Sequence, residues 1–351
     1  MKNATYCIGL MSGTSLDGLD ICYVRFDDAQ HFEILEAITI EYSIEWRKKL
    51  QDAYQYSAMD LCELDGAFGY YLGEQVSDFV NKYQINQLDF VASHGQTIFH
   101  QPAKHFTLQI GNGAAIAARC QQKVVCDFRT QDVVLGGQGA PLVPIGDELL
   151  FSQYDACLNL GGFSNISMNR NGKRIAFDIC PINLVLNHYA KQLGKEYDEN
   201  GALAQQGKVN NELVEELNEL EFYQQSFPKS LGFEWVTNEF LTIVDNYEIP
   251  VEDKLRSCVA HFTFQVNNIF ETYDINNVLI TGGGVRNTFF INSLKEVSSV
   301  EIIIPSAKLI DFKEALIFAF LGYRKMNNQI NCLTSVTGAS KDHSSGIVYD
   351  Y

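Results

Sequence analysis

Residues 11–20 are Met11-Ser12-Gly13-Thr14-Ser15-Leu16-Asp17-Gly18-Leu19-Asp20, and they directly follow an apolar run, residues 6–10, that predicts a first β-strand. The glycines let the backbone approach a ligand closely. The hydroxyl, amide and carboxylate groups of this turn suit phosphate oxygens and a hydrated Mg²⁺ ion, with Asp17 as the candidate metal ligand. The common Gly-x-x-x-x-Gly-Lys-Ser/Thr phosphate loop does not occur in the sequence. A β-turn made of ordinary turn-forming residues explains the same composition equally well.

The pattern of apolar residues outside this turn repeats itself once along the chain. The predicted strands are residues 6–10, 21–26, 34–40, 90–92, 107–110 and 123–126, and then 156–160, 163–168, 174–177, 278–281 and 301–304. The predicted helices are residues 45–56, 61–83, 184–192, 211–220, 255–273 and 312–325, with another after Gly284. Each half therefore has three clustered strands followed by alternating helices and strands, and a Gly/Ser turn after its first strand.

This repetition predicts an α/β protein with mixed sheets, each half beginning with an antiparallel meander. The run Gly136-Gly137-Gln138-Gly139-Ala140-Pro141 interrupts the periodicity, and we place a domain crossing there. The predicted domains are residues 1–145 and 146–351, with the last helix able to pack back on the first domain. Two similar lobes whose glycine turns face each other would clamp a nucleotide between them.

Composition excludes several classes of partner. The chain has 351 residues, of which 46% are hydrophobic and 20% charged, as expected for a soluble globular protein. Its net charge is −17 and no block of Lys and Arg occurs, which argues against nucleic acid or an anionic membrane surface. The nine cysteines form no Cys-x-x-Cys pair, so free thiols in a reducing cytoplasm are expected. Neither a secretion signal nor an apolar run of about 20 residues occurs, which predicts a cytoplasmic protein.

Two further turns and one aspartate are candidates for chemistry. Gly282-Gly283-Gly284 follows a predicted strand and opens a helix, where the backbone can approach a flat ring or a phosphate. Asp178 stands at a strand end just before a proline, a rigid position that suits a general base. A tight strand-to-helix turn and an N-cap aspartate are the plain structural alternatives.

A group of polar residues follows two other predicted strands. Ser93, His94 and Gln96 carry side chains that can bind sugar hydroxyls, and Arg129 can hold a carboxylate in bidentate fashion. A structural salt bridge from Arg129 to Asp127 or Asp132 is an equally good interpretation. The histidines at 94, 100 and 105 match no zinc signature, and Cys180 has no evident activating partner.

Several segments, in this order, resemble the anhydro-N-acetylmuramic acid kinase family, a branch of the sugar kinase, hexokinase and actin superfamily. The resemblance extends from near residue 6 to near residue 340. It rests on residues 8–20, 93–100 (Ser-His-Gly-Gln-Thr-Ile-Phe-His), 109–111, 127–129 (Asp-Phe-Arg), 136–144, 159–166 (Asn-Leu-Gly-Gly-Phe-Ser-Asn-Ile), 281–284, 314–315 and 336–339 (Val-Thr-Gly-Ala). Each segment alone is a modest signal, but together they are specific.

The resemblance implies two actin-like (ribonuclease H-like) lobes that bind ATP and Mg²⁺ in a cleft between them, a homodimer, and a role in recycling cell-wall sugars. In the implied reaction, water opens the internal ether of 1,6-anhydro-N-acetylmuramic acid and the freed O6 takes the γ-phosphate. Asp178 matches the general base, Glu314 the acidic residue that helps to hold sugar and water, and Arg129 the arginine near the sugar. The residues implied around ATP are Gly13, Thr14, Ser15, Leu16, Asp17, Gly18, Leu19, Asp20, Gly161, Gly162, Gly282, Gly283 and Gly284.

The sequence departs from the family beside the implied base. The family pattern Asp-Thr-Gly-Pro-Gly-Asn is replaced by Asp178-Ile179-Cys180-Pro181-Ile182-Asn183. A left-handed backbone at Ile182 would be strained, and the added side chains are expected to narrow the sugar pocket. A second departure lies at residues 227–234, which lose a hydroxyl and a cation of the family pattern, and an aspartate of the family is Asn187 here. Two alternative functions remain, an ordinary sugar kinase with another substrate and a non-catalytic ATP-binding regulator, while Glu314 alone is equally consistent with a solvated helical carboxylate.

Overall fold

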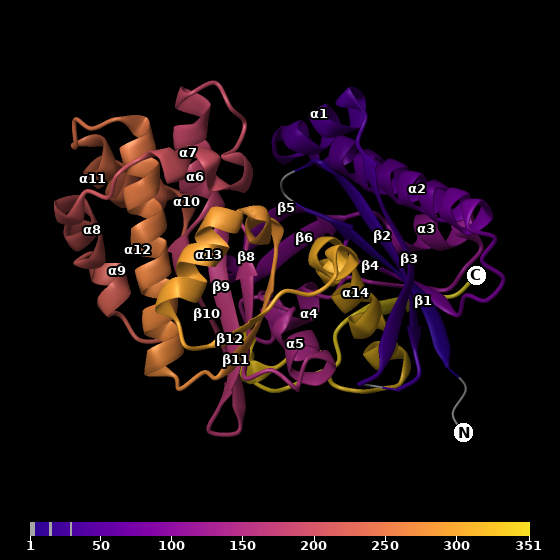
Figure 1. Ribbon diagram of the computed structural model, residues 1–351. Coiled ribbons are helices and arrows are strands. Elements are labelled where there is room, and N and C mark those ends of the chain that lie inside the picture. The colour runs from indigo at the N-terminus through magenta and orange to yellow at the C-terminus, as the bar shows by residue number, and fades with distance from the viewer. Residues whose placement is uncertain (1–3, 14–15, 29) are drawn as a thin grey trace. The chain divides into compact units, whose positions relative to one another are not determined.

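The computed structural model describes residues 4–13, 16–28 and 30–351 (Figure 1). The chain divides into two compact units, one made of residues 1–150 together with 312–351 and the other of residues 151–311. In the described part of the chain, each unit is built on one larger sheet with helices packed against it.

The sheet of the first unit has the strand order β13-β7-β4-β1-β2-β3. Its strands are β1 (Thr5–Ser12), β2 (Gly18–Phe26), β3 (Phe32–Glu41), β4 (Phe90–Ser93), β7 (Val124–Cys126) and β13 (Ile347–Tyr349). The first three form the predicted antiparallel meander, and β4 and β7 continue the sheet in parallel. The helices of this unit are α1 (Ile44–Asp52), α2 (Ala58–Lys82), α3 (Gly113–Cys120), α4 (Thr130–Val134), α5 (Pro144–Leu150), α14 (Ala307–Met326, from Phe312 onward) and α15 (Thr334–Thr337).

Strand β1 is covered on both faces, which explains its unbroken apolar run. Ile8 and Leu10 belong to the hydrophobic core that also contains Phe68 and Leu72 of α2. The alternate residue Gly9 faces α14, and a Cβ atom there would lie 1.9 Å from the carbonyl oxygen of Ala315. Because side chains alternate along a strand, these two sets of residues necessarily meet different layers. Figure 1 shows α2 and α3 beside this sheet.

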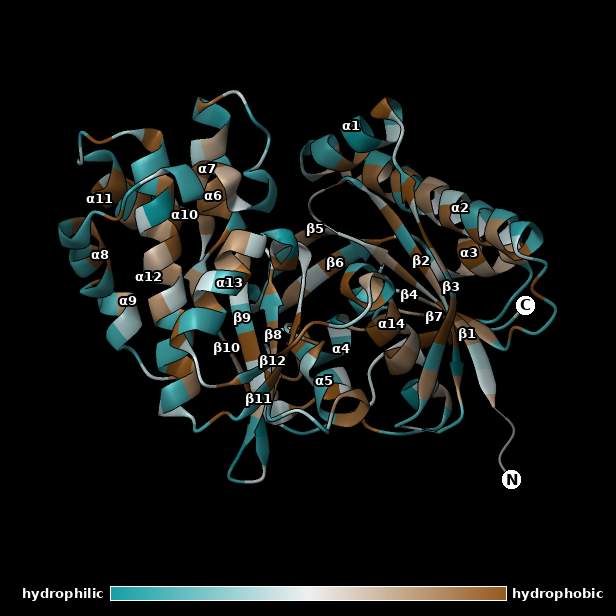
Figure 2. Cartoon of the chain, in the orientation of Figure 1, coloured by the Kyte–Doolittle hydropathy of each residue, from teal (hydrophilic) through white to brown (hydrophobic). Residues whose placement is uncertain are grey.

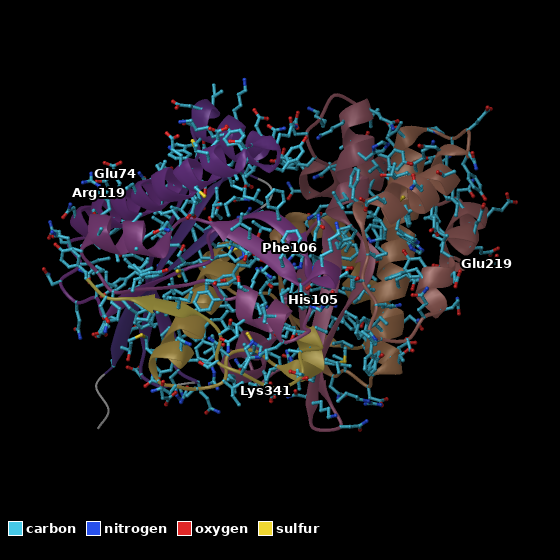
Figure 3. All side chains as sticks on the ribbon, turned by 180° about the vertical axis from the view of Figure 1, so that it is seen from behind. Glu74, His105, Phe106, Arg119, Glu219 and Lys341 are labelled. Atoms are coloured by element: carbon cyan, nitrogen blue, oxygen red, sulfur yellow. The ribbon has the colours of Figure 1, made fainter. Side chains whose placement is uncertain are left out.

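Helix α2 owes its position to an apolar stripe with helical spacing. It begins after Ser57, whose hydroxyl accepts a hydrogen bond from the Asp60 amide. The buried residues that follow from Leu64 are Phe68, Leu72, Val76 and Phe79. On the outer surface Glu74 of α2 forms an exposed ion pair of 2.7 Å with Arg119 of α3 (Figure 3). An exposed pair of this kind stabilises the fold by at most about 1 kcal/mol. The buried stripe therefore contributes most of the free energy that holds α2 against the core of the first unit.

The sheet of the second unit has the strand order β10-β9-β8-β11-β12. Its strands are β8 (Ala156–Leu160), β9 (Phe163–Arg170), β10 (Lys173–Pro181), β11 (Asn277–Thr281) and β12 (Glu301–Ile303). Its helices are α6 (Asn183–Gln192), α7 (Ala202–Gln206), α8 (Asn211–Asn218), α9 (Glu221–Gln224), α10 (Phe233–Trp235), α11 (Leu241–Asp245), α12 (Val251–Thr272) and α13 (Thr288–Val297). One core joins the sheet to these helices, and Figure 2 shows hydrophobic residues along the strands and hydrophilic residues over much of α8.

The two sheets repeat one topology. In both, the second and third strands pair antiparallel beside the first, while two later strands extend the sheet in parallel on its other side. The internal duplication and the mixed α/β class predicted from the sequence are therefore confirmed. The predicted class, two actin-like (ribonuclease H-like) units with mixed sheets flanked by helices, is the fold observed.

Some elements differ from the prediction. Residues 107–110 do not join the larger sheet, because β6 (Phe106–Ile110) pairs only with β5 (Gln96–Gln101) in a separate hairpin. The tip of this hairpin carries His105, which has a left-handed φ of 58°, and the exposed Phe106 (Figure 3). Strand β13 and helix α3 were not predicted. β13 has only three residues, and its first two are exposed, so it shows no alternation of buried and exposed positions.

All nine cysteines lie in the described part of the chain and are free thiols, as the sequence predicts. Among the described residues, no helix is both long and apolar enough to cross a membrane.

Candidate functional site

The turn between β1 and β2 begins directly after Ser12. The Gly13 carbonyl accepts a hydrogen bond of 3.2 Å from the Leu16 amide, and Leu16 has a left-handed φ of 56°. Thr14 and Ser15, two of the predicted ATP ligands, lie outside the described residues. Asp17 has an exposed side chain at the end of the turn. An exposed carboxylate beside a tight turn is chemically suited to a hard divalent cation and its waters.

The second half of this motif is part of the sheet. A Cβ atom on Gly18 would lie 2.7 Å from the Ile40 carbonyl oxygen, so β3 leaves room for glycine only. Leu19 is fully buried in the core, and Asp20 accepts a hydrogen bond of 2.6 Å from the Thr39 hydroxyl. These three residues thus have structural reasons for their identity, while Asp17 is the exposed residue of the described part of the motif.

The glycine turns of the second unit lie next to each other. Strands β8 and β11 are parallel and paired, with Asn159 opposite Thr281, so the turns that follow them share one edge of the sheet. At that edge the Gly162 carbonyl accepts hydrogen bonds from the Ile182 and Leu184 amides, at 2.9 and 3.3 Å. The carboxyl edge of parallel strands is where open α/β sheets bind their ligands.

Three consecutive glycines after β11 have different surroundings. Gly282 has a φ of +87°, and a Cβ atom there would lie 2.6 Å from the Asn159 side-chain oxygen. A Cβ atom on Gly284 would lie 2.8 Å from Leu160 Cβ. By contrast, a Cβ atom on Gly283 would meet nothing within 4 Å. Packing of the chain therefore requires glycine at positions 282 and 284, whereas at 283 the described structure leaves space for a larger residue.

Asp178 lies in β10, where the register shifts by one residue between Asp178 and Cys180. Its carboxylate accepts a hydrogen bond of 2.8 Å from the Leu231 amide, and its own amide donates to the Lys229 carbonyl at 3.1 Å. Burial raises the pKa of Asp178 above its ordinary value, and the Leu231 amide opposes that shift. Asp178 is not an N-cap, because helix α6 has Ile182 in that position. A fixed carboxylate with a raised pKa has the properties of a general base.

The two residues beside Asp178 that depart from the family pattern are both buried in the hydrophobic core. Cys180 and Ile182 are 0% and 1% exposed, within the hydrophobic cluster of the second unit. The φ of Ile182 is −108°, and Cys180 is also outside the left-handed region, so the expected strain is absent. Burial raises the pKa of the Cys180 thiol to about 12, which makes it a poor nucleophile.

Arg129 and His94 form a direct pair in the first unit. Arg129 Nε donates to His94 Nε2 at 3.0 Å, and Arg129 Nη1 donates to the Gly139 carbonyl at 2.6 Å. Burial and the Arg129 cation together lower the pKa of His94 to about 3, so His94 is neutral at physiological pH. No ion pair within 4.0 Å joins Arg129 to Asp127 or Asp132 among the described residues, so the salt-bridge interpretation of Arg129 is wrong.

The other predicted sugar ligands, Ser93 and Gln96, are hydrogen-bonded within the fold. Ser93 Oγ accepts from the Gly95 amide at 3.2 Å, and the Gln96 side-chain oxygen accepts from the Ser12 hydroxyl. Ser12 also bonds the Tyr42 hydroxyl at 2.6 Å. This buried network links the end of β1 to β5. Nothing in the sequence pattern pointed to Tyr42, which is far from the motifs along the chain.

Glu314 lies on α14 in the same unit as Arg129 and keeps an exposed side chain. Nearby protein removes part of the water around its carboxyl and raises its pKa, while the Arg129 and Lys313 cations oppose that shift. The negative charge of Glu314 in turn raises the pKa of Arg129 and so opposes the lowering that burial causes. The fold thus brings the charges of Arg129 and Glu314, which are far apart in the sequence, close enough to act on each other.

Comparison with known proteins identifies the family. A family model described as "Anhydro-N-acetylmuramic acid kinase" matches residues 5–351. The chain belongs to the anhydro-N-acetylmuramic acid kinase family. Curated kinases of that name from Clostridioides difficile (strain 630) and Pasteurella multocida (strain Pm70) are both 34% identical to it. The first alignment covers 95% of each chain, and the second covers 99% of this chain and 98% of the relative. The protein is therefore an enzyme, a kinase of this family.

Solved structures with similar folds are more distant. Component A of the Acidaminococcus fermentans (R)-2-hydroxyglutaryl-CoA dehydratase is 12% identical, with a TM-score of 0.48, and the match covers 92% of this chain and 99% of that one. A ROK family glucokinase from Streptomyces griseus, solved with glucose and AMPPNP, is 12% identical with a TM-score of 0.42, covering 90% of this chain and 98% of that one.

Proposed function

We propose that this anhydro-N-acetylmuramic acid kinase opens 1,6-anhydro-N-acetylmuramic acid with water and transfers the γ-phosphate of ATP to the freed O6. The products are N-acetylmuramic acid 6-phosphate and ADP. The observation that carries the proposal is Asp178, a carboxylate with a raised pKa that the Leu231 amide holds in one orientation. A positioned base of this kind typically accelerates a reaction by about 10²- to 10⁴-fold.

In the proposed reaction Asp178 takes a proton from water while the water oxygen forms a bond to the anomeric carbon. The bond between that carbon and O6 breaks, and O6 then attacks the γ-phosphorus of ATP as the bond to the β-phosphate oxygen breaks. Glu314 helps to hold the sugar and the water. The side chains of Cys180 and Ile182 are buried in the core of the second unit. We therefore propose that these two departures do not narrow the sugar pocket, and that the substrate is the one that the family name gives.

Arg129 is proposed to bind the carboxylate of the substrate. Its Nε and Nη1 atoms already donate to His94 and Gly139. Because a guanidinium has five N–H donors, the donors on Nη2 remain suited to an anion. His94 keeps Arg129 in place as a neutral acceptor and adds no charge that would repel it. Ser93 and Gln96 remain proposed sugar ligands, although Gln96 is committed to Ser12 through its side-chain oxygen.

The nucleotide is proposed to bind at the glycine-containing turns described above. The turn that contains Gly13, Leu16 and Asp17 binds the phosphates together with the turn at Gly161 and Gly162. Gly282, Gly283 and Gly284 lie near the adenosine in this proposal. Thr14, Ser15, Gly18, Leu19 and Asp20 complete the proposed set. Mg²⁺, when bound beside Asp17, neutralises phosphate charge during transfer. We also propose a cytoplasmic homodimer that recycles cell-wall sugars; light scattering of the purified chain tests the dimer.

The test of this function is turnover of ATP with and without the anhydrosugar, in ¹⁸O-labelled water. Attack by water predicts that the prompt product carries the label on the anomeric oxygen and none on the transferred phosphate. A control with unlabelled N-acetylmuramic acid 6-phosphate corrects for exchange with solvent. Product without the label indicates an ordinary kinase acting on a free hydroxyl. Failure to use the anhydrosugar, with turnover of another sugar, would leave the family and discard the substrate.

Substitution at Gly283 tests the proposed adenosine site. We expect Gly283→Leu to weaken ATP binding about tenfold or more, equivalent to about 1.4 kcal/mol, while Gly283→Ala has a smaller effect. The reason is that a Cβ atom at this position meets no protein atom within 4 Å, so a loss of affinity arises from the ligand and not from misfolding. Calorimetric titration with an ATP analogue measures the affinity, and thermal unfolding checks the fold. Equal affinities in both variants and the parent would remove Gly283 from the nucleotide site.

A further inference from the structure

A buried cluster in the first unit has no part in the proposed reaction. Cys332 and His343 come from the segment after α14, and Asp132 comes from α4. The three are 2%, 5% and 0% exposed. One Sγ, ring nitrogen or carboxylate oxygen from each lies within 4.8 Å of the other two. Among the residues that the structure describes, this is the one group of its kind.

The backbone explains why Cys332 and His343 are neighbours. They are directly opposite in an isolated antiparallel bridge, where the Cys332 amide donates to the His343 carbonyl at 3.1 Å and the reverse bond measures 3.2 Å. Residues paired in this way direct their side chains to the same face. The ten residues between them along the chain obscure this proximity in the sequence, which shows no ordinary metal-binding spacing.

Only one of the two ring nitrogens of His343 has a hydrogen-bond partner in the described structure. Nδ1 lies 3.1 Å from the Lys341 carbonyl oxygen, so Nδ1 carries a hydrogen and donates it. Lys341 itself is labelled in Figure 3. Nε2 is buried without a hydrogen-bond partner in the described structure, and it lies 3.6 Å from Asp132 Oδ1. That distance is too long for a hydrogen bond. A neutral His343 would therefore direct a lone pair at a carboxylate, an arrangement that requires a cation between the two.

The carboxylate of Asp132 is itself fixed by neighbouring donors. The Thr337 hydroxyl donates to Oδ1 at 2.7 Å, and the Gly139 amide donates to Oδ2 at 2.7 Å. Together with the Lys341 carbonyl on His343 Nδ1, these bonds orient two of the three side chains. Hydrogen bonds of this kind, from backbone and hydroxyl groups to the outer atoms of ligands, are characteristic of metal sites in proteins.

We propose that Asp132, Cys332 and His343 bind a divalent transition-metal ion, for which Zn²⁺ is the best match. Thiolate, imidazole and carboxylate are the three ligand types that Zn²⁺ takes, whereas Mg²⁺ and Ca²⁺ prefer oxygen ligands alone. With Zn–N and Zn–O distances of about 2.0–2.1 Å, tetrahedral coordination separates ligand atoms by roughly 3.4 Å. The observed 3.6 Å between Nε2 and Oδ1 fits this geometry. Water fills the fourth position, and binding releases the proton of the Cys332 thiol.

The ion would fasten the C-terminal segment to α4, which begins immediately after Arg129. Gly139 connects the same two sites, because its amide binds Asp132 and its carbonyl accepts from Arg129. The metal site is therefore structural, and it supports the position of Arg129 without taking part in the reaction. Its existence does not depend on the proposed substrate, so the two proposals can fail separately.

The first test uses the full-length protein after dialysis against a chelator. Titration with Zn²⁺ in competition with a chromophoric chelator is expected to show one tight site per chain. Titration with Co²⁺ is expected to give thiolate-to-metal charge-transfer absorption in the near ultraviolet. The midpoint of thermal unfolding is expected to rise with Zn²⁺, because binding to the folded state stabilises it.

Variants locate the site. Cys332→Ser and His343→Gln are each expected to weaken Zn²⁺ binding about 100-fold or more, since even changes in the outer shell cost about 10- to 100-fold. Cys126→Ser is the matched control: Cys126 is also a buried cysteine of the first unit, on β7, and its loss should leave Zn²⁺ affinity unchanged. The Co²⁺ spectrum of the parent protein remains decisive if a variant fails to fold.

Three results would each overturn the proposal. The first is the absence of a thiolate–cobalt band in the parent protein. The second is equal Zn²⁺ affinity in the parent and Cys332→Ser. The third is ¹⁵N NMR evidence that both ring nitrogens of His343 stay protonated when Zn²⁺ is present in excess. In that case His343 is an imidazolium paired with Asp132, and the proton is the missing cation.

Discussion

Asp178→Asn is expected to lower kcat by about 10²-fold or more while the fold and ATP binding are retained. The substitution removes the group that accepts a proton but preserves the shape of the side chain. The Leu231 amide can still donate to the asparagine carbonyl oxygen, so the 2.8 Å contact that holds residue 178 is not lost. Steady-state turnover with the anhydrosugar measures the effect, and calorimetric titration with an ATP analogue measures nucleotide binding. Activity close to that of the parent would reject Asp178 as the base.

The hydrogen bond from Leu231 provides the control for this prediction. Leu231→Pro removes the amide hydrogen, whereas Leu231→Ala keeps it. Because that hydrogen bond stabilises the charged carboxylate, its loss raises the pKa of Asp178 beyond the rise that burial already causes. A base acts in its deprotonated form, so the acidic limb of the profile of kcat/KM against pH is expected to move to higher pH in Leu231→Pro only. An unmoved limb in a folded Leu231→Pro enzyme would mean that the limb belongs to another group.

Gly9→Ala is expected to cause the largest loss of stability, about 3 kcal/mol, at the upper end of the usual cost of overpacking. The added Cβ atom would lie 1.9 Å from the Ala315 carbonyl oxygen, so β1 and α14 must move apart. Glu314 is the preceding residue on α14, and we expect turnover to fall as well. Urea unfolding monitored by circular dichroism measures the shift of the midpoint.

The matched control is Gly66→Ala on α2. A Cβ atom at Gly66 meets nothing within 4 Å, so this change is expected to stabilise the protein by about 0.5–1 kcal/mol through helix propensity. The two substitutions add the same methyl group to the same unit. If Gly9→Ala unfolds at the urea concentration of the parent, then the close approach of α14 to β1 is not required for stability.

The sequence predicted the sheets because their strands are continuous or alternating apolar runs bounded by glycine turns. It also predicted the repeated topology, since each half begins with three closely spaced strands that can pair only with near neighbours. The family motifs further indicated Asp178, Arg129 and the glycine turns, because tight turns and charged residues at strand ends are visible locally. The sequence correctly predicted a strand at residues 107–110 but did not predict its partner. Periodicity identifies a strand but not the strand with which it pairs, which here is β5 of the separate hairpin.

The sequence by itself determined most strands of the two larger sheets, the long helices and the family to which the chain belongs, because these depend on local pattern and on motifs. Only the tertiary structure decided which residues meet across long separations. It returned α14 to the first unit beside Gly9, paired Arg129 with His94, directed Cys180 and Ile182 into the core, and placed His343 opposite Cys332 beside Asp132. The physical reason is that such contacts form when separate apolar faces are buried together, and no local window of sequence contains both partners.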